Sequence, residues 1–310
     1  MSRMHFGSPA GGRPVERLTI AAGELTARIL TFGAALQDLR HAGVAHPLTL
    51  GSENLADYEG PMRTAGTIVG PVANRIAGAT AMIDGQRHRF EANEGRNTIH
   101  GGSAGTQGKV WELRDEGPAH VTLGLTLADG EGGFPGTRRL TARFAAEAPA
   151  RLTLTLMAET EAPTLINLAN HSYWHLGGPG APQELSSPAD HYLPIDAEKL
   201  PTGEIARVEG TQFDFREPRP VGSQGYDHCL CLARARRPLT HAAELTGGGL
   251  RMTMETTELG LQVYDGRAGA GVALEAQGWP DAPNRPDFPS ILLRPGERYE
   301  QITRWSFGRA

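Results

Sequence analysis

Glu275 has the residue type and position that most clearly suggest chemistry, because its carboxylate directly follows the apolar run Val272-Ala-Leu274. A carboxylate inside a buried strand is costly unless it is paired or functional. Burial also raises the pKa of a carboxyl group and makes the group a better base near neutral pH. The residues alone leave a second interpretation open, in which Glu275 is a strand residue that points outward into solvent.

The stretch 167–178 brings amide, imidazole, hydroxyl and aromatic groups together after a β-like run. His171, Tyr173 and His175 have the spacing that places side chains on one face, provided that the strand continues. Aromatic rings beside hydrogen-bonding groups suit a sugar, whose C–H faces are apolar and whose edges carry hydroxyls. A core tryptophan, Trp174, with polar groups capping it explains the stretch equally well, so both interpretations stay open here.

Two glycine-bounded segments and one short polar motif add further candidates. Asn74 and Arg75 lie between Gly70 and Gly78, and His100 is followed by two glycines, where a backbone can approach a ligand closely. Asp227 lies in the motif Tyr-Asp-His at 226–228. Each segment taken alone also fits a solvated surface loop.

The elements that must position these groups are strands. Apolar and polar residues alternate in 25–30, 121–127, 151–159 and 250–255, which predicts half-buried strands. Turn dipeptides such as Asp84-Gly85 and Asp129-Gly130 lie between such runs. Helical periodicity is scarce, and only 52–58 is expected to hold a short helical turn.

The composition agrees with many strands joined by turns. The chain has 310 residues with 40 glycines and 22 prolines, above the usual combined share of about 12% and scattered throughout. No part of the sequence differs markedly in composition from the rest, and no strict repeat is visible. The sequence therefore predicts an all-β fold, with residues 1–310 forming a single domain built as a large antiparallel β-sandwich.

Charge and cysteine content argue against several protein classes. The formal net charge is −5 and no basic stripe is present, so we expect neither nucleic acid nor a membrane as partner. No run approaches the roughly 18 apolar residues of a membrane span, and the first residues lack the apolar stretch of a signal peptide. Cys229 and Cys231 are expected to be free thiols, which suits a reducing compartment. A cytoplasmic protein is the resulting prediction.

Together, these segments resemble the aldose 1-epimerase (galactose mutarotase) family over nearly the whole chain. Single motifs could occur by chance, but ten of them follow in the family's order. The segments that carry the resemblance are Asn74-Arg75-Ile76, His100–Gly102, Asp129–Gly136, Asn170–Trp174, Pro201–Glu204, Phe213–Arg216, Tyr226–His228, Gln262–Tyr264, Leu274–Gln277 and Leu293–Glu297.

The resemblance implies a function and a set of site residues. The family's fold is a single large β-sandwich, the galactose mutarotase-like supersandwich, and its activity is the interconversion of α and β anomers of a free aldose. By the family's motifs, His171 is the general acid and Glu275 the general base. The same motifs assign sugar binding to Asn74, Arg75, His100, Tyr173, Asp227 and Gln262.

Ring opening needs one proton removed from the anomeric hydroxyl and one supplied to the ring oxygen. We expect Glu275 and His171 to perform these transfers from opposite sides of the hemiacetal carbon, without a metal or other cofactor. The partner is then a small sugar, and the protein is a monomer or a homodimer. His175 stands where many relatives have asparagine, and Pro71-Val72 replaces a frequent Arg-Tyr pair, so the preferred aldose stays open.

Three other functions fit parts of the same pattern. A non-catalytic sugar-binding protein on the same fold would not need both Glu275 and His171. A mutarotase for sugar phosphates would need additional arginine or lysine, whereas the motifs contain only Arg75 as a clear candidate. A metal hydrolase could draw on His100, His171, His175 and His228, but their spacing matches no known ligand set, so we expect no metal site.

Overall fold

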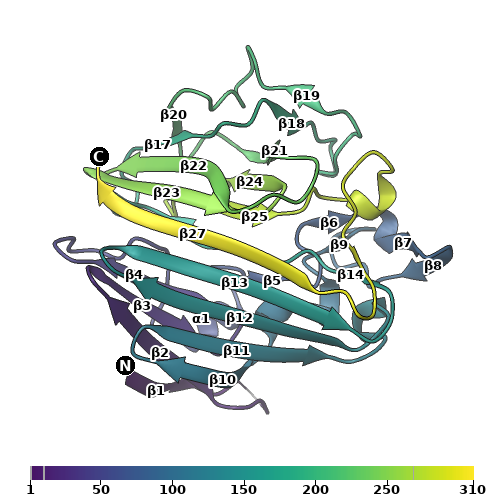
Figure 1. The fold of residues 1–310 in the computed structure, drawn as a ribbon, viewed down its shortest axis with the longest axis horizontal. Helices are drawn as coiled ribbons and strands as arrows, with labels where there is room; N and C mark the ends of the chain where they lie inside the picture. Colours follow the sequence, from purple (N-terminus) through teal and green to yellow (C-terminus); the bar gives the residue numbers. More distant parts are fainter. Residues whose placement is uncertain (1, 10, 268) are drawn as a thin grey trace.

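The computed structural model describes residues 2–9, 11–267 and 269–310 and is built almost entirely from antiparallel β-structure (Figure 1). The predicted all-β antiparallel sandwich is confirmed. Strands occupy the predicted segments, for example β3 (Leu25–Leu30) and β13 (Arg151–Thr160), and the expected helical turn is α1 (Leu55–Glu59). Within the described residues, no helix is long and apolar enough to cross a membrane.

A nine-stranded sheet extends through the whole molecule (Figure 1). Along its long central strands, alternate residues are buried and the residues between them are part-exposed, as expected for a sheet with one covered face. Its strands, in spatial order, are β10 (Glu112–Gly117), β11 (His120–Leu127), β12 (Arg138–Glu147), β13, β27 (Tyr299–Arg309), β23 (Leu250–Thr256), β22 (Thr240–Gly247), β17 (Gln183–Ser186) and β20 (Arg219–Val221).

Two further sheets cover the buried face of this sheet. The first has four strands, β1 (Ser2–Gly7), β2 (Val15–Ala22), β3 and β4 (Leu36–His41), and its strands β2 and β3 pack on β11 and β12. The second has six strands: β16 (Tyr173–Trp174), β25 (Val272–Gln277), β24 (Gly260–Tyr264), β21 (Asp227–Cys231), β18 (His191–Leu193) and β19 (Ala206–Arg207).

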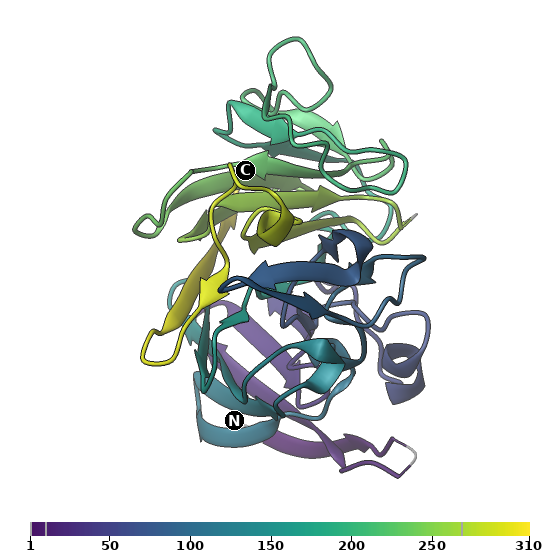
Figure 2. The ribbon, with the colours of Figure 1, turned by 90° about the vertical axis from the view of Figure 1, so that its right-hand side faces the viewer.

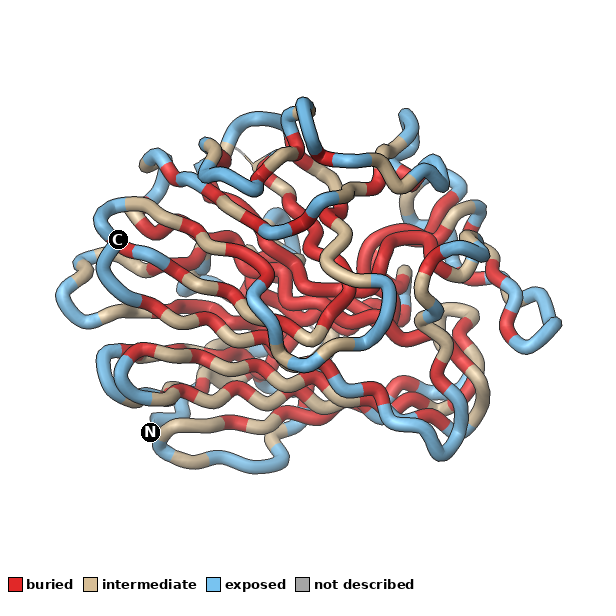
Figure 3. The backbone as a smooth tube through the Cα atoms, turned by 45° about the horizontal axis from the view of Figure 1, so that its top comes forward, coloured by how far each residue is buried: buried red, intermediate tan, exposed pale blue. Residues whose placement is uncertain are grey.

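The core lies between these layers. One continuous hydrophobic cluster takes side chains from all three large sheets, among them Ile20, Leu123, Met254 and Leu274. In Figure 3 the buried residues follow the middles of the strands, and the exposed residues lie mainly in the connecting loops. The packed core therefore holds the six-stranded sheet rigidly from one side and leaves its other face for the loops.

Short strand pairs and turns fill the region between the upper and lower sheets (Figure 2). Asp84 and Gly85 form the tight turn of one such pair with φ of 46° and 80°, as a two-residue hairpin turn requires. The pairs are β5 (Ile68–Val69) with β15 (Ala169–Asn170), β6 (Arg75–Ile76) with β9 (Thr98–Ile99), β7 (Thr80–Ile83) with β8 (Gln86–Arg89), and β14 (Thr164–Leu165) with β26 (Leu292–Leu293). Single 3₁₀ turns lie at Ala77–Ala79, Gly102–Ala104, Thr106–Gly108, Glu131–Gly133 and Ala282–Asn284.

Candidate active site

A cleft of about 390 Å³ lies on the face of the six-stranded sheet that is turned away from the core. The alternation of β24 and β25 creates this face. Leu261, Val263 and Leu274 point into the hydrophobic core, whereas Tyr264 and Glu275, on the opposite face, line the cleft. Loops from the middle of the chain form the remaining walls.

Glu275 is buried at the bottom of this cleft, with 2% of its surface exposed. Its strand β25 pairs with β24 on one side, where Glu275 is opposite Gln262, and with β16 on the other. Burial is the main cause that raises the pKa of Glu275 to about 8, and the nearby negative charge of Asp227 is the second. The outward-facing interpretation of Glu275 is therefore wrong.

His171 lies in a break between two short strands rather than within one strand. β15 pairs with β5, β16 pairs with β25, and the backbone of His171 bonds to Gly66 and Thr67 in the interval. His171 and Tyr173 both line the cleft, with ring centroids 5.1 Å apart. His175 lies outside it, near His46, so the prediction that all three face one side holds only for the first two.

The imidazole of His171 and the carboxylate of Glu275 share the cleft, with Nε2 and Oε1 3.6 Å apart. No carbon atom fits between two polar atoms at this separation, so the two groups lie side by side. This differs from the expected placement on opposite sides of a hemiacetal carbon. Burial, with the charge of Arg267 as a smaller cause, lowers the pKa of His171 to about 4.

Asn74 and His100 face each other where the β6–β9 pair begins. Both have a left-handed backbone, with φ of 61° and 49°, which is uncommon outside glycine and recurs at functional sites. The Asn74 N–H donates to Nδ1 of His100 at 3.2 Å, and the His100 N–H donates to the carbonyl of Asn74 at 3.0 Å. Burial keeps the pKa of His100 well below its ordinary value, so the imidazole is neutral. Because Nδ1 accepts the Asn74 N–H, the single ring proton is on Nε2, which can serve as a donor.

Close packing requires the first of the two glycines after His100. Gly101 has a φ of 80°, and a Cβ there would lie 2.4 Å from the carbonyl oxygen of Gly70. The segment containing His100 thus packs directly on the segment that leads to Asn74 and Arg75. The sequence motif His-Gly-Gly is explained by this approach of two backbones.

Arg75 is fixed by carboxylates. Its Nε and Nη2 donate to Glu94 at 2.5 and 2.9 Å, and its Nη1 lies 3.9 Å from Asp227. Asp227 also accepts a hydrogen bond from Gln262 at 2.8 Å and pairs with Lys199 at 3.0 Å. Gln262 does not line the cleft itself; it contacts the site through Asp227.

The structure brings seven of the eight predicted residues into the lining of one cleft, with Gln262 directly behind it: Asn74, Arg75, His100, His171, Tyr173, Asp227 and Glu275. Sequence reasoning missed the cations Arg63, Lys199 and Arg267, which also line the cleft. They come from three separate loops outside the residues assigned to the site, so no local pattern marked them. Arg75 remains the only clear cation within the motifs, but the cleft also contains these three cations from outside them.

The two departures from the family pattern lie outside the cleft. Neither His175 nor the pair Pro71-Val72 is part of its lining. Among the residues that the structure describes, no group of three or more His, Cys, Asp or Glu side chains is arranged to hold a metal ion. His228, for example, packs on Phe213 with ring centroids 4.1 Å apart.

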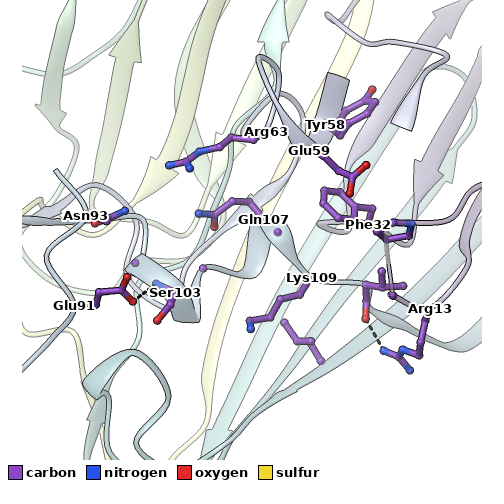
Figure 4. A pocket seen from close by; sticks show the side chains of 17 residues that line it. Arg13, Phe32, Tyr58, Glu59, Arg63, Glu91, Asn93, Ser103, Gln107 and Lys109 are labelled. Atoms are coloured by element: carbon purple, nitrogen blue, oxygen red, sulfur yellow. Dashed lines mark hydrogen bonds between the residues drawn. The ribbon is translucent and has the colours of Figure 1, made fainter. Parts of the chain in front are cut away.

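A larger groove of about 780 Å³ adjoins the cleft and shares Arg63 and Asn93 with it (Figure 4). Figure 4 shows Asn93 at one end of this groove and Arg13 at the other, with Lys109 between them. None of the residues predicted to act in chemistry lines the groove. We therefore place the candidate site in the smaller cleft, which holds the close pair of titratable groups with shifted pKa values.

Comparisons with known proteins agree over the full length of the chain. A family model described as aldose 1-epimerase matches residues 16–306. The galactose mutarotase of Bos taurus is 34% identical over 341 residues, covering 100% of this chain and 99% of its own. The aldose 1-epimerase of Escherichia coli is 29% identical over 333 residues, covering 96% of each chain.

Solved structures also match this chain over nearly its full length. A galactose 1-epimerase from Lactobacillus acidophilus matches with a TM-score of 0.88 and 27% identity, covering 100% of this chain and 98% of its own. An aldose epimerase homologue from C. elegans matches with a TM-score of 0.88 and 27% identity, covering 95% and 99%.

Proposed function

The chain belongs to the aldose 1-epimerase family and interconverts the α and β anomers of an aldose, and we propose that Glu275 and His171 perform the two proton transfers of this reaction. The observation that carries the proposal is the separation of 3.6 Å between the carboxylate and the imidazole in one buried cleft. The aldose substrate follows from the family, and the proposed proton transfers call on no cofactor because Glu275 and His171 exchange protonation states in each direction.

The proposed mechanism moves one proton in each direction. Glu275 takes the proton from the anomeric hydroxyl, and a carbonyl forms at C1 as the bond from C1 to the ring oxygen breaks. The electron pair of that bond stays on the ring oxygen, which takes a proton from His171. The open aldehyde rotates about C1–C2, and the reverse transfers close the ring with the opposite configuration.

The side-by-side placement of the two groups suits this chemistry. The anomeric oxygen and the ring oxygen are bonded to the same carbon, so they are only two bonds apart. A base and an acid separated by 3.6 Å can therefore each approach one of these oxygens. His100, with its donor Nε2, and Arg75 are proposed to hold the sugar hydroxyls around them.

We expect a broad pH optimum for kcat/KM. The pair of Glu275 and His171 must hold one proton in total, because one group acts as base and the other as acid. With a pKa of about 4 for His171 and about 8 for Glu275, the pair holds two protons below pH ~4, where His171 is also protonated, and none above pH ~8, where Glu275 has lost its proton. Between these limits the single proton lies mainly on Glu275, and it must be on His171 for the transfers described above. Polarimetry across pH, corrected for the buffer-catalysed rate, measures the profile; a single step near 6.5 would contradict the assignment.

Replacement of Arg75 should weaken sugar binding as well as turnover. Arg75→Gln removes the donors that face the cleft and leaves Glu94 and Asp227 without their shared cation. We expect KM to rise and kcat/KM to fall by about 10- to 100-fold. The matched control is Arg87→Gln on the exposed strand β8. Unchanged kinetic constants in the Arg75 variant would show that this residue does not contact the sugar.

A non-catalytic sugar-binding protein is less well supported, because binding alone does not require a buried acid–base pair. Saturable binding of sugar without any acceleration of anomer exchange would favour it.

We also propose a single domain spanning residues 1–310 and a cytoplasmic location. The hydrophobic cluster shared by the three large sheets and the free thiols of Cys229 and Cys231 support these two proposals.

A further inference from the structure

Four cations line the cleft, Arg63, Arg75, Lys199 and Arg267, and two of them have no acidic partner. Arg75 is paired with Glu94, and Lys199 is paired with Asp227 at 3.0 Å. Among the described residues, no carboxylate lies within ion-pair distance of Arg63 or Arg267. A neutral sugar needs hydrogen-bond donors but not two uncompensated positive charges.

The two unpaired arginines belong to one corner of the cleft. Arg63 lies in the turn that follows α1, and Nη2 of Arg267 donates a hydrogen bond to the carbonyl of Pro61 in the same turn. The guanidinium of Arg267 also lies over the ring of Tyr173, 5.6 Å from its centroid. A guanidinium has five N–H donors. In Arg267 only Nη2 donates to a described residue, so this bond fixes the side chain while its other N–H groups remain available to a ligand.

This corner lies on the side of the cleft from which the ring oxygen is protonated. The ring of Tyr173 is 5.1 Å from that of His171, the proposed acid. In a pyranose the ring oxygen is bonded to C1 and to C5, and C5 carries the exocyclic C6. A substituent on C6 is therefore directed toward the side of His171, Tyr173 and Arg267.

We propose that the preferred substrate is an aldose with an anionic group on C6, a carboxylate or a phosphate, and that Arg267 and Arg63 bind this group. The proposal rests on the proposed function and specifies its substrate class. Arginine is the residue best suited to the task, because its planar fork matches the oxygens of both anions.

The charges of the empty cleft support the same conclusion. After burial, Arg267 is a cause of the lowered pKa of His171, and Arg63 contributes in the same direction for His100. These positive charges disfavour a proton on the proposed acid. An anion bound at Arg267 offsets the charge and makes it easier for His171 to hold the proton that it must donate.

The test compares D-galactose, D-galacturonate and D-galactose 6-phosphate as substrates of the wild-type protein, with anomer exchange followed by polarimetry. We expect kcat/KM for at least one anionic sugar to exceed that for galactose by about tenfold or more. The preference should decrease as ionic strength rises, because salt screens the added interaction. Galacturonate and the 6-phosphate separate a carboxylate site from a phosphate site.

The variant R63Q/R267Q should reduce the ratio of anionic to neutral kcat/KM to about one. The control R114Q/R139Q removes the same charge from exposed positions on β10 and β12 and should keep the wild-type ratio. A wild-type ratio of one or less, or a ratio that persists in R63Q/R267Q, overturns the proposal. If the wild type accelerates none of the three exchanges, the proposed function itself fails; if it accelerates only galactose, this inference alone fails.

Discussion

Glu275→Gln should lower kcat by about 10²–10⁴ while sugar still binds, because the amide keeps the size of the side chain but cannot take a proton. The site favours a large effect, since Glu275 is 2% exposed and, among the described residues, no other carboxylate forms an ion pair with His171. KM should change little, because the lost interaction acts during proton transfer rather than in binding. Polarimetry of freshly dissolved sugar measures kcat and KM.

The matched control for this experiment is Glu116→Gln, the same change on the exposed strand β10. Both variants should unfold at a temperature close to that of the wild type, since neither removes volume from the core. A Glu275 variant that retains near-normal polarimetric rates would show that another group removes the anomeric proton.

His171→Asn should lower kcat by a similar factor, about 10²–10⁴, because asparagine cannot supply a proton to the ring oxygen. If His171 and Glu275 act as one unit, the double variant should lose about as much activity as either single variant. Multiplicative losses would mean that the two side chains act independently and would contradict the paired mechanism. The same polarimetric assay measures all three variants.

His175→Asn is the control for the imidazole. His175 lies on the same segment, is also buried and has a pKa lowered by burial, but it does not line the cleft. We expect its kcat to remain within a few-fold of the wild-type value. A loss as large as that of the His171 variant would mean that the segment as a whole, rather than one imidazole, determines the activity.

Most of the fold could be predicted from the sequence, because alternation along a half-buried strand reflects the physical environment of each residue. The segment 151–159 shows the pattern, and β13 has it because one face packs on the core while the other is part-exposed. Motif resemblance identified the residues around the cleft, since those motifs are local in the sequence. Their roles remain predictions until the variants are measured.

Three features could not be predicted for reasons that lie in tertiary structure. The cations Arg63, Lys199 and Arg267 come from loops that are distant in sequence and meet only in the folded chain. The equal spacing of His171, Tyr173 and His175 assumed one continuous strand, whereas two short strands with different partners replace it. The side-by-side geometry of the acid and base depends on how two segments pack, which spacing along the chain does not encode.

The two outer strands of the nine-stranded sheet have a consequence for behaviour at high concentration. An unpaired strand edge can template the addition of another chain, which leads to aggregation. β10 carries Arg114, Asp115 and Glu116 as exposed side chains, and β20 is only three residues long with Pro220 at its centre. Charge at one edge and a missing N–H donor at the other oppose extension of the sheet into a neighbouring molecule, so a crowded solution of folded chains should resist polymerisation through these strands.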